Sequence, residues 1–136
     1  CPRIAYMPQG LGRNLYPTLS VEENLRLPCE VLGLTELEMQ ERLSHVLEVV
    51  PQLKPMLARS GAALSGGQGK MVALGRALMV GTSLVLLDEP FQGLAPALAL
   101  QYAEALSRLR QSRPDLAVII TESNAALLTD IPNQIL

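Results

Sequence analysis

The chain has 136 residues, the length of one ordinary domain, and its 49% hydrophobic and 18% charged content is that of a globular protein with a buried core. Eleven basic and thirteen acidic side chains give a net charge of -2, which gives no reason to expect nucleic-acid binding or adhesion to an anionic lipid surface. No apolar run reaches the roughly 18 to 20 residues of a membrane helix, and Cys1 and Cys29 lack metal-type spacing. We therefore expect reduced thiols and a cytoplasmic setting.

Strand and helix signals follow one another along the chain. In order, they predict a strand at 3–7, helices at 21–32, 36–50 and 68–79, a strand at 83–87, a helix at 97–111, a strand at 117–121, a short helix at 124–128 and the start of a strand at 134–136. Capping boxes, Ser20 with Glu23 and Thr35 with Glu38, mark the first two helix starts. The order from residue 83 onward predicts right-handed crossovers and a parallel α/β sheet.

Two adjacent acids end the apolar strand at 83–87. Open α/β sheets place their ligands at the carboxyl ends of the strands, where Asp88 and Glu89 are expected. In phosphoryl transfer, Asp88 would hold Mg²⁺ directly or through its water, and Glu89 would polarise an attacking water. The alternative is a strand that simply ends in a solvated loop.

The third helix is preceded by the pentapeptide Leu64-Ser65-Gly66-Gly67-Gln68. A hydroxyl at the cap and two glycines let backbone N–H groups approach an anion closely, so the segment is typical of phosphate binding. An N-cap with flexible glycines is the alternative, and it explains only the helix start.

These two segments, together with the glutamine that follows the first strand (Met7-Pro8-Gln9), resemble the signature, Walker B and Q-loop segments of ATP-binding-cassette (ABC) ATPases. The resemblance covers nearly the whole chain. The wording at 16–25 (YPTLSVEENL), 72–79 (VALGRALM) and 93–96 (GLAP) is most similar to ATPases of branched-chain amino-acid uptake systems and their urea or amide relatives. It implies a partial P-loop NTPase fold, a parallel α/β sheet with an inserted α-helical subdomain. Residues 1–20 would form a core strand and the Q-loop, 21–80 the helical subdomain, and 81–136 the rest of the core.

The resemblance also implies residue roles. Gln9 would contact Mg²⁺ and the attacking water, and Glu89 would be the catalytic base. Ser65, Gly66 and Gly67 would bind the γ-phosphate of an ATP held by the opposite subunit, with Gln68 beside that nucleotide. The site would then exist only in a head-to-tail dimer of ATPase subunits.

A subunit of this kind implies transmembrane permease subunits as partners, a peripheral position on the inner face of the cell membrane, and coupling of ATP hydrolysis to solute import. The alternatives are a non-transport relative acting on ribosomes and a catalytically incompetent fragment. Pull-down with membrane subunits against co-sedimentation with ribosomes distinguishes a transporter subunit from a relative that acts on ribosomes.

Two departures from the family pattern bear on activity. The phosphate-gripping Walker A loop should precede the Q-loop, and the sequence does not contain it, so we expect this chain alone to be inactive. We expect either that it is one piece of a longer polypeptide or that it self-associates through an exposed sheet edge. The position of the switch histidine is occupied by Ser123.

Overall fold

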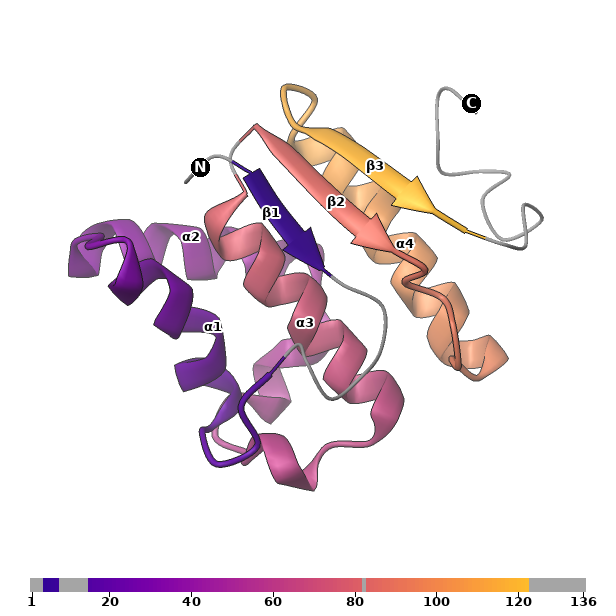
Figure 1. Cartoon of the computed structure of the whole chain (residues 1–136), viewed down its shortest axis with the longest axis horizontal. Helices are drawn as coiled ribbons and strands as arrows, with labels where there is room; N and C mark the ends of the chain where they lie inside the picture. Colours follow the sequence, from indigo (N-terminus) through magenta and orange to yellow (C-terminus); the bar gives the residue numbers. More distant parts are fainter. Residues whose placement is uncertain (1–3, 8–14, 82, 123–136) are drawn as a thin grey trace.

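A three-stranded parallel sheet forms the centre of the structure (Figure 1). The computed structural model describes residues 4–7, 15–81 and 83–122. Strands β1 (Ile4–Met7), β2 (Leu84–Asp88) and β3 (Ala117–Thr121) pair in the order β1-β2-β3, with Ile4 opposite Leu84 and Leu84 opposite Ala117. The predicted parallel α/β sheet is therefore confirmed. The elements expected at 124–128 and 134–136 lie outside the described residues.

The helices begin where the sequence provides side-chain caps. Their bounds are α1 (Val21–Val31), α2 (Glu36–Val49), α3 (Gly66–Val80) and α4 (Pro96–Ser112), with two short 3₁₀ helices, η1 (Pro51–Met56) and η2 (Gly61–Ala63), in the segment between α2 and α3. Both predicted capping boxes are present. Helix α3 starts two residues earlier than expected, because Ser65 and Gln68 form a third capping box. None of the helices in the described ranges combines the length and apolarity needed to cross a membrane.

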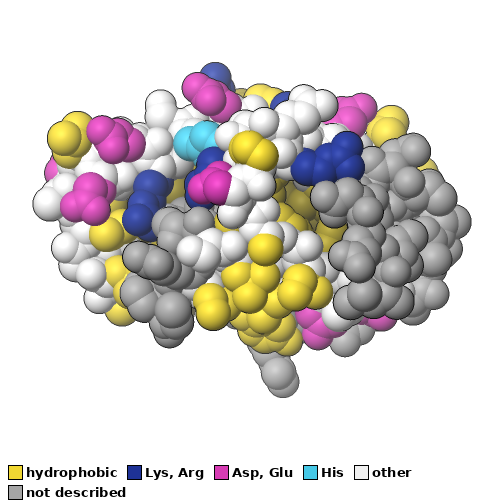
Figure 2. Space-filling view, turned by 90° about the horizontal axis from the view of Figure 1, so that it is seen from above, with side chains coloured by type: hydrophobic (Ala, Val, Ile, Leu, Met, Phe, Trp, Pro, Cys, Tyr) yellow, Lys and Arg dark blue, Asp and Glu magenta, His cyan; other side chains and the backbone are white. Residues whose placement is uncertain are grey.

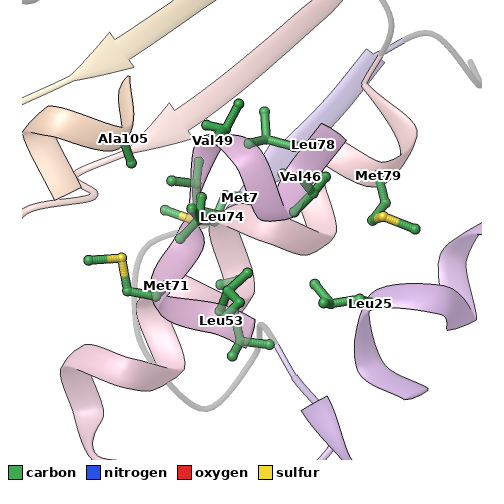
Figure 3. Close-up of a cluster of buried hydrophobic side chains, with 14 of the residues drawn as sticks. Met7, Leu25, Val46, Val49, Leu53, Met71, Leu74, Leu78, Met79 and Ala105 are labelled. Atoms are coloured by element: carbon green, nitrogen blue, oxygen red, sulfur yellow. The ribbon is translucent and has the colours of Figure 1, made fainter. Parts of the chain in front are cut away.

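Side chains from α1, α2, α3 and β1 converge on one hydrophobic core (Figure 3). Leu25, Val46, Leu53 and Leu74 are completely buried within it. Helices α1 and α3 cross closely at Gly75, where an added Cβ would lie 2.8 Å from Leu25 Cδ2 and 2.9 Å from Leu53 Cδ1. The helical segment and the sheet thus share one packed interior, with α3 as its central element.

The two faces of the sheet differ in burial. Helices α3 and α4 pack on one face, where Met7, Val85 and Leu87 are buried (Figure 1). The opposite face carries Ile4, Tyr6 and Ile119 with exposed fractions of 44%, 58% and 52%. Figure 2 shows hydrophobic side chains gathered at the surface on this side of the molecule. We call the face that carries Ile4, Tyr6 and Ile119 the open sheet face.

Candidate functional site

The carboxyl ends of the strands and the N-termini of α3 and α4 lie at the same end of the molecule (Figure 1). Helix α3 runs antiparallel to β2, so its first turn lies beside the loop that leaves β2. A Cβ added at Gly67, in the first turn of α3, would lie 2.2 Å from Leu98 Cδ1 in the first turn of α4. This is the edge at which parallel α/β sheets bind ligands.

Asp88 ends β2, and its carboxylate accepts two hydrogen bonds from neighbouring strands. Thr121 Oγ1, at the end of β3, donates to Oδ1 at 2.6 Å, and the Tyr6 hydroxyl, from β1, donates to Oδ2 at 3.4 Å. The carboxylate is half-buried, so it is both oriented by protein donors and accessible. Sequence reasoning missed Thr121 and Tyr6. Both lie on the Asp88 side of their strands, a relationship that depends on the parallel register and has no signal in the sequence alone.

Glu89 has a backbone conformation that non-glycine residues seldom adopt. Its φ is +47°, in the left-handed region. Its amide donates to the Thr121 carbonyl oxygen at 2.9 Å, so the residue is fixed to the end of β3. Such a conformation persists only where surrounding contacts enforce it, and it is most frequent at functional sites.

The first turn of α3 presents the predicted anion-binding segment. Ser65 and Gly66 are exposed, and Gly67 and Gln68 are half-buried. Ser65 Oγ accepts from the Gln68 amide at 3.2 Å, and Gln68 Oε1 accepts from the Ser65 amide at 3.0 Å. The hydroxyl retains its donor capacity, whereas the missing Cβ of Gly67 leaves space that Leu98 fills. One glycine therefore faces outward and the other serves helix packing.

Lys70 is a site residue that sequence reasoning missed. It lies one turn into α3, and its side chain is only 6% exposed. The ammonium group donates to the main-chain carbonyls of Glu89 (3.4 Å), Pro90 (3.3 Å) and Gln92. Burial lowers the pKa of Lys70, while the nearby Glu122 and Glu89 carboxylates act in the opposite direction. Its position four residues before Leu74, on the buried face of α3, was the available signal.

The residues present fit a magnesium ion only together with a nucleotide. No group of three or more metal-ligating side chains occurs in the described ranges. Mg²⁺ commonly takes one or two carboxylates, several waters and substrate phosphates, so the oriented, accessible carboxylate of Asp88 matches that requirement. Gln9, the other expected ligand, and Ser123 lie outside the described residues.

Comparisons with known proteins agree with this parallel α/β architecture. Residues 2–92 match the ABC transporter family. The chain therefore belongs to the ABC transporter family.

Among curated relatives, the chain is 38% identical over 122 residues to the high-affinity branched-chain amino acid transport ATP-binding protein BraG of Pseudomonas aeruginosa, covering 90% of this chain and 50% of BraG. It is 37% identical over 115 residues to the maltose/maltodextrin import ATP-binding protein MalK of Yersinia pestis, covering 85% of this chain and 31% of MalK. The chain thus spans 50% of the length of BraG and 31% of the length of MalK.

A solved structure of the ATP-binding subunit of an ABC transporter superposes with a TM-score of 0.77 at 29% identity. The match covers 96% of this chain and 52% of that subunit. The ABC ATPase fold is thereby shown for the described architecture.

Proposed function

We propose that the chain supplies the signature and Walker B half-sites of an ABC transporter's ATP-binding subunit, which couples ATP hydrolysis to solute import. The observation that carries the proposal is the pairing of an oriented Asp88 carboxylate with a left-handed Glu89 at the end of β2. Similarity to BraG and MalK, both named as ATP-binding proteins, supports it.

In this proposal Asp88 and Glu89 have separate catalytic roles at the end of β2. Asp88 holds Mg²⁺, which when bound would neutralise charge on the phosphates of ATP. Glu89 accepts a proton from the water that attacks the γ-phosphate, as a general base. Gln9 lies two residues beyond the end of β1 in the sequence and is proposed as a further contact to the metal and water.

The signature turn belongs to the second half-site of a head-to-tail dimer. Ser65 and Gly66 are exposed, which leaves the Ser65 hydroxyl and the first amides of α3 available to the γ-phosphate of an ATP held by the opposite subunit. Gly67 and Gln68 complete this turn. Because each subunit contributes different groups to each site, hydrolysis requires two copies.

The helical segment 21–80 is the proposed contact for the permease subunits. A groove of about 450 Å³ lies between α1, α3 and β1, and it is lined by Ile4, Tyr16, Leu27, Pro28, Val31, Leu32, Arg76 and Val80. Arg76 stacks on the Tyr16 ring at 5.4 Å and donates to the Asn24 carbonyl at 2.9 Å, so the groove has a rigid wall. An apolar lining with one fixed cation suits an amphipathic segment of a membrane subunit.

Branched-chain amino acids are the solute that we favour. BraG matches a larger share of this chain than MalK does, 90% against 85%, at nearly equal identity. Uptake of radiolabelled leucine and of maltose in cells lacking the encoding gene tests this choice. Loss of maltose uptake alone would refute it.

The catalytic assignment is tested by Glu89→Gln in the polypeptide of full natural length. We expect ATP binding to be retained and turnover to fall by roughly 10²- to 10⁴-fold, the usual contribution of a general base. Glu104→Gln, at an exposed position on α4, is the matched control and should turn over normally. Unchanged turnover in Glu89→Gln would refute the role of Glu89.

A mixing experiment tests the composite site. Glu89→Gln and Gly66→Asp subunits are each expected to form inactive dimers. When the two are mixed, turnover should recover to roughly a quarter of the wild-type value, since half of randomly assembled dimers are mixed and each holds one intact site. A mixture as inactive as its components would contradict the head-to-tail arrangement.

A further inference from the structure

The buried ammonium group of Lys70 is fully engaged by one short loop. An ammonium has three N–H donors, and Lys70 directs them at three main-chain carbonyls, those of Glu89, Pro90 and Gln92. A lysine with 6% exposure is rare, because removing the charge from water is costly unless polar partners replace it. Within the described residues, the hydrogen-bond partners of this charge lie in the loop that leaves β2.

That loop is held from two sides. On one side, the Glu89 amide donates to the Thr121 carbonyl at 2.9 Å, which fixes the entry to the loop on β3. On the other side, Lys70 binds the carbonyls from α3. Within the loop the Gln92 amide donates to the Glu89 carbonyl at 3.2 Å, closing a turn. The Glu89 carbonyl thus accepts from both Gln92 and Lys70.

The enforced conformation at Glu89 needs such contacts. Its φ of +47° is unfavourable for a residue with a Cβ, and it persists only where neighbouring groups over-determine it. The direction of the Glu89 side chain follows from this backbone conformation. A donor that fixes the Glu89 carbonyl therefore fixes the direction in which the side chain leaves the backbone, and with it the region that the carboxylate can reach.

We propose that Lys70 is a positioning residue for Glu89: from the signature helix it fastens the loop 89–92 and holds the carboxylate of Glu89 in the orientation used for hydrolysis. This inference rests on the proposed function, because Glu89 has a role to be positioned for only if it is the base. Lys70 itself touches neither ATP nor the attacking water in this account.

The test uses the polypeptide of full natural length and three variants of lysine. Lys70→Met keeps the apolar stem and removes every donor, and Lys70→Arg retains charge and donors. Lys54→Met is the matched control, because Lys54 is the only other lysine in the 136 residues and is exposed on η1.

For Lys70→Met we expect kcat to fall by roughly 10- to 100-fold while KM for ATP stays within about twofold, because misplacing a catalytic group slows chemistry without removing ground-state contacts. Lys70→Arg should restore part of kcat, and Lys54→Met should leave both constants unchanged. If folded Lys70→Met has wild-type kcat, the proposal is wrong.

A double variant separates positioning from a general structural role. If Lys70 acts through Glu89, Lys70→Met should cause little further loss of kcat in a Glu89→Gln background, since the group it positions is already gone. A further loss as large as in the wild type would overturn the proposal. If Glu89→Gln turns over normally, the proposed function fails instead, and the two failures are distinguished.

Hydrogen exchange gives a readout that needs no turnover. In Lys70→Met the amides of Glu89 and Gln92 should exchange at least about tenfold faster, while those of α2 should be unaffected. If Lys70→Met loses protection everywhere, the same measurement is made on Lys70→Arg, in which wild-type protection at Glu89 and Gln92 supports the proposal. Unchanged protection at Glu89 and Gln92 in a folded variant would show that Lys70 does not hold the loop.

Discussion

The hydroxyl of Thr121 donates a hydrogen bond to Asp88 Oδ1 across 2.6 Å, from the last residue of β3 to the last residue of β2. The two residues are register partners in the parallel ladder, so the backbone pairing brings the hydroxyl to the carboxylate. The carboxylate proposed to hold Mg²⁺ is therefore oriented by the neighbouring strand. In the proposed site, Thr121 would orient the metal-holding carboxylate without being a ligand itself.

Replacing Thr121 with valine should weaken the response to magnesium. Valine keeps the β-branched shape and removes the hydroxyl, so Asp88 loses its shorter hydrogen bond. We expect the Mg²⁺ concentration for half-maximal ATPase activity to rise by about 10-fold, the lower end of the effect of losing an outer-shell partner. Thr121→Ser, which retains the hydroxyl, should behave as the wild type. A wild-type magnesium profile in Thr121→Val would contradict this role.

The same substitution should have opposite effects at two positions of α3. Among the described residues, a Cβ added at Gly69 would meet Leu15 Cδ2 at the ordinary contact distance of 3.4 Å, and Gly69 already donates a helical hydrogen bond to the Ser65 carbonyl at 2.9 Å. Gly69→Ala should therefore increase the free energy of unfolding by about 0.5 to 1 kcal/mol, through the better helix propensity of alanine.

Gly75→Ala is the opposing case. Its new methyl group would lie under 3.0 Å from Leu25 Cδ2 and Leu53 Cδ1, so both leucine side chains would have to shift inside the packed core. Overpacking of this kind costs about 1 to 3 kcal/mol. Urea unfolding of both variants measures the two values, and a stabilised Gly75→Ala would contradict the close crossing of the helices.

Asn24 should be among the least replaceable polar residues of the helical segment. It is completely buried, its Oδ1 accepts from the Tyr16 amide at 2.6 Å, and its Nδ2 donates to the carbonyls of Tyr16, Leu19 and Ser20. Asn24→Ala should lower the free energy of unfolding by about 1 to 3 kcal/mol, because buried main-chain groups lose their partners. Asn24→Asp should cost more, since a carboxylate would face those carbonyls. Urea unfolding gives both values.

Acid should weaken the contact between α1 and α2. Arg26 donates hydrogen bonds to the Glu36 carboxylate, and this contact, followed by one from Gln40, lowers the pKa of Glu36. The folded-state pKa is below the unfolded value of about 4.3, so the stabilisation is complete above that pH and is lost as pH falls through the folded pKa.

Glu36→Gln should accordingly reduce the pH dependence of stability below about pH 4.3. The measurement is the urea midpoint at a series of pH values. Glu48→Gln, an exposed glutamate near the other end of α2, is the control. An identical pH profile for Glu36→Gln and the wild type would contradict a contribution from the ion pair.

The sequence was sufficient for the strands of the sheet and for the starts of α1 and α2, because local signals determine them. The apolar strand before Asp88 and the capping boxes at Ser20 and Thr35 needed no tertiary information. The S-x-x-Q spacing of Ser65 and Gln68 is the pattern of a third capping box, and it predicts the observed start of α3.

The connections within the site could not be predicted in the same way. Lys70 binds carbonyl groups about twenty residues away, and main-chain carbonyls have no signature in the amino-acid sequence. The Thr121 bond to Asp88 depends on the register of two strands that are separated by α4. Residue types indicated which groups we propose for the chemistry, and only the packing reveals which groups hold them in place.

The open sheet face sets the conditions under which this polypeptide can remain dispersed in water. Tyr6 and Ile119 form an exposed aliphatic and aromatic surface to which chaperones, hydrophobic dyes and unfolded polypeptides would bind. While that surface is in contact with water, we expect solubility and folding yield to depend on it more than on the strand ends. Aggregation through this face would therefore limit the yield of folded protein before any loss of activity did.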